Sequence, residues 1–96
     1  MNINQIKQVT DPVFKKHKIT KASLFGSAVR GEIKSESDID FLINPAQGTT
    51  LFDMVGIKVD LENSLGRPVD IVTYGGISPF LREQILKNQK VIYEKR

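Results

Sequence analysis

The chain has no cysteine and only one histidine, His17, and it has no long hydrophobic run. The absence of cysteine excludes disulfide bonds and thiolate metal sites. The first residues, MNINQIKQVTDP, contain no apolar segment of signal-peptide length, and no window approaches the roughly 20 apolar residues of a membrane helix. We therefore expect a soluble, cytoplasmic protein without a membrane partner, and we assign no role to His17.

Size and charge narrow the possibilities further. The sequence has 96 residues, of which 40% are hydrophobic, and its net charge is +3. This length fits one domain, residues 1–96, with a small core. Lysines alternate with acidic residues, which is typical of a solvated surface, so a nucleic-acid partner is not expected. A mildly positive field nevertheless favours an anionic ligand such as a nucleoside triphosphate.

Hydrophobic spacing and turn signals predict alternating helices and strands. Helical spacing covers residues 3–17, where Pro12 predicts either a kink or a restart because it lacks the amide that would bond to Gln8. Strands are expected at residues 21–25, 38–44, 69–74 and 91–93. Thr50 is expected to cap a helix that ends near Leu65, and Ser78 to cap the last helix. The class is therefore α/β, with a small mixed β-sheet flanked by helices.

Two of these helices carry apolar positions that we expect to face the core. For the second helix they are Leu51, Met54, Val55, Leu61 and Leu65, and for the last helix they are Leu81, Ile85 and Leu86. Four aromatic residues are expected in the core or in an interface rather than as stacking platforms for a base: Phe52, Phe80, Tyr74 and Tyr93.

Three aspartates lie in or beside strands that are otherwise apolar. Asp38 and Asp40 precede the run FLI, and side-chain alternation places both on one face of the strand. Like charges at this spacing raise one pKa unless a cation lies between them. Asp70, in PVDIVT, is a third carboxylate of this kind. On a shared face, three carboxylates can hold two Mg²⁺ ions about 3.5–4 Å apart, as suits a displacement at phosphorus.

Each of these features also has a plainer explanation. Asp-x-Asp at a strand end often caps loop amides, and Asp70 can be a salt-bridged strand residue. Gly26 and Ser27 form either an ordinary tight turn or a phosphate-binding turn that opens a helical turn over residues 27–30. Arg30 is either an ion-pair partner of Glu32 or a phosphate clamp, and its forked guanidinium favours the clamp.

The order of these features resembles a known family. Gly26-Ser27, ten further residues and then the triplet DID at 38–40 are similar to the signature of the DNA-polymerase-β-like nucleotidyltransferases. The segments LFGSAVRGE, SESDIDFLI and GRPVDIVT resemble the minimal nucleotidyltransferase (MNT) branch, and SPFLREQILKNQKVIYE resembles its last helix and strand. The resemblance covers nearly the whole chain.

The resemblance implies an activity and a partner. Asp38 and Asp40 would bind two Mg²⁺ ions, Asp70 would complete the catalytic metal site and help deprotonate the acceptor, and Gly26 and Ser27 would hold the triphosphate of ATP. An acceptor oxygen would attack the α-phosphorus, and pyrophosphate would leave. Members of this branch are commonly antitoxins that adenylylate a tyrosine of a HEPN-domain toxin, a likely RNase, in two-gene modules.

Other functions remain open at this point. The chain could be an antitoxin that acts by contact alone, although three unpaired acids would be costly to keep in a relic site. Transfer to a small molecule, or to RNA ends, are further alternatives. Larger relatives append a helical domain that grips the base and the acceptor, and only three residues follow Tyr93 here. We therefore expect a second copy or a partner protein to complete the site.

Overall fold

The computed structural model describes residues 1–26, 29 and 38–95. Its elements, in chain order, are α1 (Ile3–Lys16), β1 (Lys21–Phe25), β2 (Ile39–Asn44), α2 (Leu51–Leu65), β3 (Val69–Thr73), the short 3₁₀ helix η2 (Tyr74–Gly76), α3 (Pro79–Asn88) and β4 (Lys90–Glu94). The predicted α/β class is confirmed. The helical turn expected at 27–30 and the loop expected at 31–37 lie outside the described residues, except for Val29.

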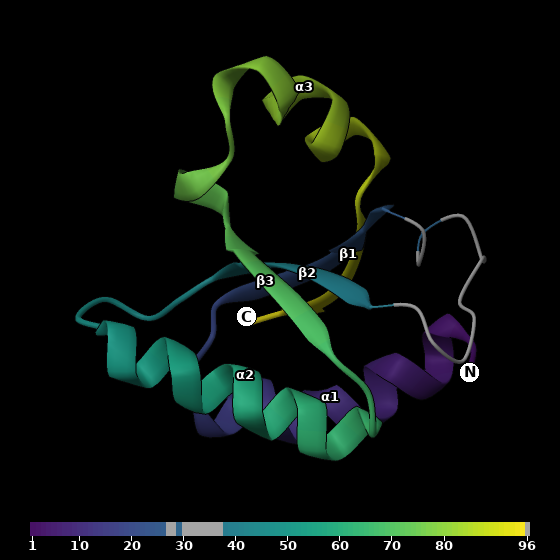
Figure 1. Ribbon diagram of the computed structural model, residues 1–96, viewed down its shortest axis with the longest axis vertical. Helices are drawn as coiled ribbons and strands as arrows, with labels where there is room; N and C mark the ends of the chain where they lie inside the picture. Colours follow the sequence, from purple (N-terminus) through teal and green to yellow (C-terminus); the bar gives the residue numbers. More distant parts are fainter. Residues whose placement is uncertain (27–28, 30–37, 96) are drawn as a thin grey trace.

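The strands form one mixed sheet in the order β3-β2-β1-β4. β1 pairs antiparallel with both β2 and β4, whereas β2 and β3 are parallel because α2 crosses over between them. Figure 1 shows α1 and α2 on one face of this sheet and α3 on the opposite face. The face that packs against α1 and α2 carries the core, and the face that carries α3 is where Asp40 and Asp70 lie.

The hydrophobic core lies between the sheet and the pair α1 and α2. Alternate residues of β2 point into it: Ile39, Phe41 and Ile43 are fully buried. The Phe14 ring of α1 packs edge-on against Phe41, with a centroid distance of 6.1 Å. The intervening residues of β2 project to the other face, and Asp40 is one of them. The expectation that helices cover at least one sheet face is confirmed.

α1 is one continuous helix through Pro12, so the predicted restart at that residue is wrong. Asn2 caps its start, in a reciprocal pair with Gln5. The Thr10 hydroxyl donates to the Ile6 carbonyl at 2.7 Å inside the protein. Ile6 and Phe14, on either side of the proline, are both fully buried. Their packing against the core holds the helix together where Pro12 removes a hydrogen bond.

His17 lies at the end of α1 and contacts α2. Its Nε2 atom lies 2.7 Å from an Asp60 carboxylate oxygen, which also accepts from Lys16 Nζ at 3.1 Å. The imidazole is mostly buried, although we expected no role for this residue. Its structural role is to join the C-terminal end of α1 to the middle of α2.

α2 has the predicted ends. The Thr50 side chain and Asp53 form a reciprocal cap at the start, and Gly66 ends the helix in the left-handed conformation at φ +69°. Among the described residues, no helix is both long and apolar enough to cross a membrane.

The predicted core-facing side of α2 is only partly correct. Leu61 and Leu65 are buried together with Ile57, which follows from their spacing of four residues. Leu51 and Val55, however, are 83% and 60% exposed. Apolar residues occur on two sides of this helix, and the sequence alone does not say which of the two meets the sheet.

α3 begins where predicted, with Ser78 at the N-cap position and Pro79 in the first turn, but the Ser78 side chain makes no capping hydrogen bond. The expectation that Leu81, Ile85 and Leu86 face the core is wrong, because α3 has no buried residue. Ile85 and Leu86 are half-buried and Leu81 is exposed. The reason is that α3 lies across the sheet from the core (Figure 1).

Of the four aromatic residues expected in the core or in an interface, one packs at the core and two are exposed; Tyr74 is described with the candidate site. Tyr93 packs on Phe14 at a centroid distance of 5.4 Å, as expected of a residue at the core. Phe52 and Phe80 are almost fully exposed, so the core is excluded for both.

Candidate functional site

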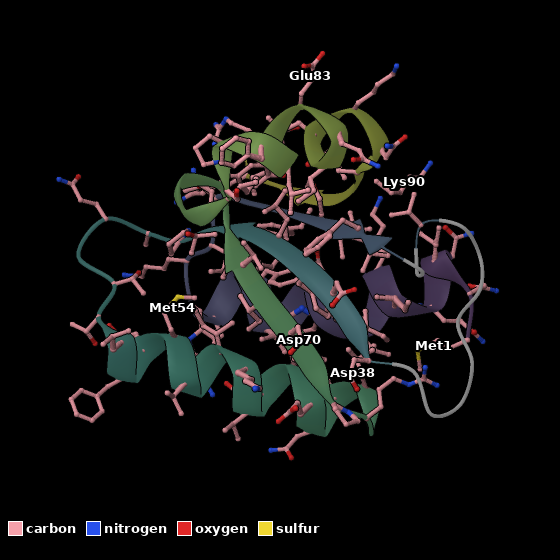
Figure 2. All side chains as sticks on the ribbon, turned by 45° about the horizontal axis from the view of Figure 1, so that its top comes forward. Met1, Asp38, Met54, Asp70, Glu83 and Lys90 are labelled. Atoms are coloured by element: carbon pink, nitrogen blue, oxygen red, sulfur yellow. The ribbon has the colours of Figure 1, made fainter. Side chains whose placement is uncertain are left out.

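The strand register brings two of the predicted carboxylates together. Asp40 of β2 pairs directly with Asp70 of β3, and paired residues of adjacent strands share a sheet face. Asp38 lies immediately before β2 and is exposed. Figure 2 shows Asp38 and Asp70 at the same end of the sheet. The three aspartates therefore gather where β2 and β3 begin, on the face that carries α3.

These carboxylates affect one another electrostatically. The pKa of Asp40 is raised first by burial, then by repulsion from Asp70 and Asp38, and finally by a hydrogen bond with the Asp70 carboxyl. All four causes disfavour the charged form of Asp40. A cation between the carboxylates would reverse this effect, because it stabilises the charged form.

The carboxylate oxygens present here suit a hard cation such as Mg²⁺, with a bound nucleotide supplying the remaining ligands. Among the described residues, no three His, Cys, Asp or Glu side chains form a ready-made metal cluster. The Asp40–Asp70 pair still supplies adjacent carboxylate oxygens. Mg²⁺ usually takes one or two protein carboxylates together with water and phosphate oxygens. The residues present therefore fit Mg²⁺ bound together with a nucleotide.

Gly26 lies directly against this cluster. It follows Phe25, which pairs with Asp40 across the sheet. Its φ is +70°, a conformation that residues with a side chain rarely adopt, and a Cβ atom built on it would lie 2.6 Å from Asp40 Oδ2. Gly26 thus allows the backbone to approach the carboxylate closely. The other two residues predicted to bind the triphosphate, Ser27 and Arg30, lie outside the described residues.

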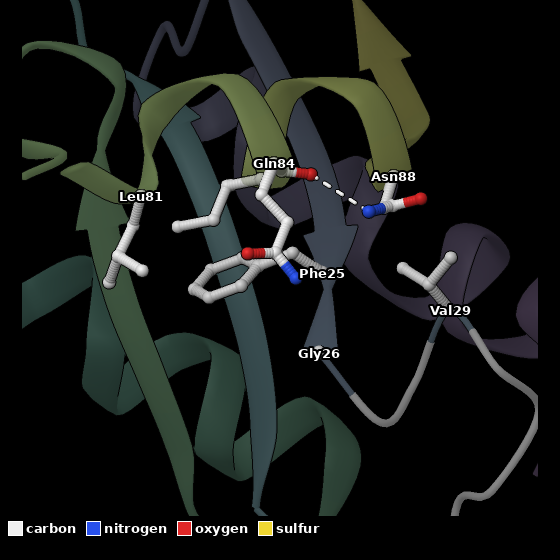
Figure 3. A pocket seen from close by; sticks show the side chains of 7 residues that line it. Phe25, Gly26, Val29, Leu81, Gln84 and Asn88 are labelled. Carbon is white, nitrogen blue, oxygen red and sulfur yellow. Dashed lines mark hydrogen bonds between the residues drawn. The ribbon is translucent and has the colours of Figure 1, made fainter. Parts of the chain in front are cut away.

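A cavity of about 430 Å³ opens on the other side of Gly26 (Figure 3). Its walls are formed by the end of β1, by Val29 and by one side of α3, through these residues: Phe25, Gly26, Val29, Leu81, Gln84, Ile85 and Asn88. The sequence analysis did not identify the two polar residues of this wall, Gln84 and Asn88. The signal was present, because residues 81, 84, 85 and 88 have the spacing of one helix face.

Tyr74 links α3 to the sheet. Its hydroxyl donates to Gln89 Oε1 at 2.7 Å, just after α3, and accepts from the buried Ser23 hydroxyl of β1 at 2.7 Å. The Arg82 guanidinium of α3 donates to the Tyr74 carbonyl at 2.8 Å. Polar contacts at Tyr74 therefore help to attach α3 to the sheet, and α3 forms one wall of the cavity beside the carboxylates.

The sequence profile of the polymerase beta nucleotidyltransferases matches residues 4–96. The chain belongs to this family. A candidate protein adenylyltransferase of Methanocaldococcus jannaschii is 46% identical over 86 residues, which cover 90% of this chain and 92% of that protein. The protein adenylyltransferase MntA of Thermococcus cleftensis is 31% identical over 75 residues, covering 78% of this chain and 74% of MntA.

Solved structures show the same fold. A structure described as a minimal nucleotidyltransferase superposes with a TM-score of 0.80 at 36% identity, and the match covers 93% of this chain and 94% of the other. The fold also occurs in a complex of the Shewanella oneidensis MNT antitoxin with its tri-AMPylated HEPN toxin, with a TM-score of 0.72 at 19% identity, covering 96% of this chain and 72% of the other. The predicted family and fold are thereby confirmed.

Proposed function

We propose that this nucleotidyltransferase is a protein adenylyltransferase that transfers AMP from ATP to a hydroxyl group of a HEPN-domain toxin, and so acts as an antitoxin. The observation that carries the proposal is the Asp40–Asp70 pair beside the Gly26 turn. Relatives at 46% and 31% identity that are named as protein adenylyltransferases support the choice of a protein acceptor.

The three aspartates would act on the acceptor and on the metal. Asp38 and Asp40 would hold Mg²⁺, which when bound neutralises phosphate charge and stabilises the attacking and leaving oxygens; two ions suit this chemistry. Asp70, on β3, would complete the metal site and help take the proton of the acceptor hydroxyl. The acceptor oxygen forms a bond to the α-phosphorus as the bond to pyrophosphate breaks.

The turn after β1 would position the leaving group. Gly26 lets the turn lie directly against Asp40, because it has no Cβ atom there, and so would place phosphates held by the turn beside the metal-binding carboxylates. Ser27 would donate its hydroxyl to the triphosphate, and Arg30 would clamp it through paired N–H donors. These contacts would orient pyrophosphate for departure in line with the attacking oxygen.

The partner is proposed from the related complexes. The Shewanella oneidensis MNT antitoxin is bound to a HEPN toxin that carries three AMP groups, and a related toxin–antitoxin pair with a TM-score of 0.78 contains AMP-PNP. We extend both features to this chain: ATP as the donor and a HEPN toxin, modified on a tyrosine, as the acceptor.

The test combines the purified chain with ATP, Mg²⁺ and the toxin encoded beside its gene, and mass spectrometry reads AMP addition. We expect the toxin to gain the mass of one or more AMP groups, and Asp38→Ala, Asp40→Ala and Asp70→Ala to reduce the gain to background. Glu83→Ala, on the exposed side of α3, is the matched control and should retain activity. A toxin that is fully inhibited yet unmodified would instead establish neutralisation by contact.

A further inference from the structure

The cavity under α3 and the carboxylate cluster share one wall. Gly26 lines the cavity, and its Cα lies so close to Asp40 that a methyl group would not fit between them. A molecule with its phosphates at Asp40 therefore needs to pass only one backbone residue to reach the cavity. The volume of about 430 Å³ falls within the range of small-molecule sites.

The lining suits a flat heterocycle with hydrogen-bonding edges. The Phe25 ring, Val29, Leu81 and Ile85 provide apolar surface, and Gln84 and Asn88 provide two side-chain amides (Figure 3). Asn88 Nδ2 already donates to the backbone carbonyl of Gln84 at 2.9 Å. The side-chain oxygen of Asn88 is left as an acceptor, and the Gln84 side-chain amide is not used by this bond. Apolar walls with a few placed polar groups are the usual composition of a cofactor or nucleotide pocket.

Sheet topology separates this cavity from the acceptor. An in-line displacement requires the acceptor to approach from the side opposite the leaving pyrophosphate. The proposed pyrophosphate site is at the turn after β1, and Asp70 is on β3, which lies beyond β2 from β1. The acceptor should therefore arrive over β3, and the cavity over β1 remains available to the nucleotide itself.

We infer that this cavity binds the nucleoside of the nucleotide substrate, with the base between Phe25 and α3 and its edge read by Gln84 and Asn88. The inference rests on the proposed function for the position of the phosphates. A side-chain amide matches the amino group and ring nitrogen of adenine in a paired fashion. The free Asn88 oxygen likewise accepts from an amino group, whereas it repels the carbonyl oxygen that guanine has at that position. With the base in this orientation, the two amides favour adenine over guanine.

This assignment changes what a partner must supply. The sequence led us to expect that a second copy or a partner protein would complete the site. With the nucleoside bound under α3, the chain binds its donor nucleotide alone, and the partner brings only the acceptor group.

The test measures nucleotide binding by calorimetry on the whole chain with Mg²⁺ and no acceptor. The ligands are ATP, GTP and inorganic tripolyphosphate, which has no nucleoside. We expect ATP to bind at least about tenfold more tightly than GTP or tripolyphosphate. Gln84→Ala and Asn88→Ala should each weaken ATP binding about threefold to tenfold, as expected for one lost hydrogen bond, and should leave tripolyphosphate binding unchanged.

Two further variants complete the test. Glu83→Ala, one residue from Gln84 and exposed (Figure 2), should bind ATP as the wild type does. Ile85→Trp should fill the cavity and abolish the advantage of ATP over tripolyphosphate while circular dichroism stays unchanged. Equal binding of ATP and tripolyphosphate by the wild type would overturn the inference. So would an Ile85→Trp variant with an unchanged KM for ATP and a raised KM for the toxin, because the cavity would then hold the acceptor.

The two proposals fail separately. ATP binding without AMP transfer to any toxin would refute the adenylyltransferase function and leave the nucleoside pocket standing. Transfer that Gln84→Ala and Asn88→Ala do not affect, with unchanged ATP binding, would refute the pocket alone.

Discussion

Gly26 is constrained both by its backbone conformation and by its neighbour Asp40. Its φ is +70°, and a Cβ atom would lie 2.6 Å from the Asp40 carboxylate oxygen. We predict that Gly26→Ala costs about 1–2 kcal/mol of stability from the left-handed conformation. It should also displace Asp40 and reduce AMP transfer at least about tenfold, since an ångström-scale misplacement costs at least that much. Chemical denaturation and the transfer assay measure the two effects.

Gly66 provides the matched control for this substitution. Its φ is +69°, and a Cβ atom there would meet nothing within 4 Å. Gly66→Ala should therefore cost a similar amount of stability and leave transfer unchanged. Equal activity of the two alanine variants would show that the contact with Asp40 is unimportant for the reaction.

At the same scale, Asp60 gives stability a defined pH dependence. Its pKa is lowered below the ordinary 3.8 by hydrogen bonds with His17 first and Lys16 second. A carboxyl whose folded pKa is depressed contributes stability above its unfolded pKa, and this contribution is lost as pH falls through the folded pKa. We predict that Asp60→Asn lowers the thermal midpoint at pH 7. The difference from the wild type should shrink as the pH falls below about 4.

The measurement is thermal unfolding followed by circular dichroism from about pH 7 to pH 3. A deficit of Asp60→Asn that stays constant over this range would mean that charge on Asp60 does not stabilise the α1–α2 junction.

At the scale of elements, α2 has two apolar sides, and substitutions on the two sides should differ in their effect on stability. Leu61 is fully buried in the core, and Val55 is 60% exposed. We predict that Leu61→Ala costs about 2–5 kcal/mol, because it removes packed methyl groups and leaves a cavity. Val55→Ala should change stability by about 0.5 kcal/mol or less. Both variants keep a good helix former in α2, so the difference in urea midpoint reports packing alone.

Comparable losses in the two variants would contradict this assignment of faces. The same pair of positions explains why the sequence was insufficient here. Leu51, Val55, Leu61 and Leu65 are all apolar, and only the packing of α2 against α1 and β3 distinguishes the buried pair from the exposed pair.

At the scale of the whole molecule, a sheet with a buried face carries a helix that is attached through polar contacts. Tyr74 joins α3 to the sheet through Ser23 and Gln89. We predict that Tyr74→Phe costs about 1–3 kcal/mol, because it removes the partner of the buried Ser23 hydroxyl. Hydrogen exchange measured by mass spectrometry should become faster in α3, while β2 keeps its protection.

Tyr93→Phe is the control, because it removes a hydroxyl but keeps the ring that packs on Phe14. Faster exchange across β2 in Tyr74→Phe would show that α3 and the core unfold as one unit. If α3 loosens alone, ATP binding should weaken with it, because α3 lines the inferred nucleoside pocket.

The sequence by itself determined the elements and the family. Thr50 and Gly66 fixed the ends of α2 because caps are local. Strand alternation predicted a shared side for Asp38 and Asp40, because alternation is a property of the strand. The spacing of glycine, serine and the aspartates identified the family, since that spacing lies within a short segment.

Only the tertiary structure decided which surfaces meet. The pairing of Asp40 with Asp70 depends on the register of two strands separated by α2, and no local signal sets that register. The continuity of α1 through Pro12, the solvent exposure of Leu51 and the position of α3 across the sheet from the core likewise depend on contacts between segments distant in sequence. The cavity beside Gly26 exists for the same reason, because its walls come from β1 and from α3.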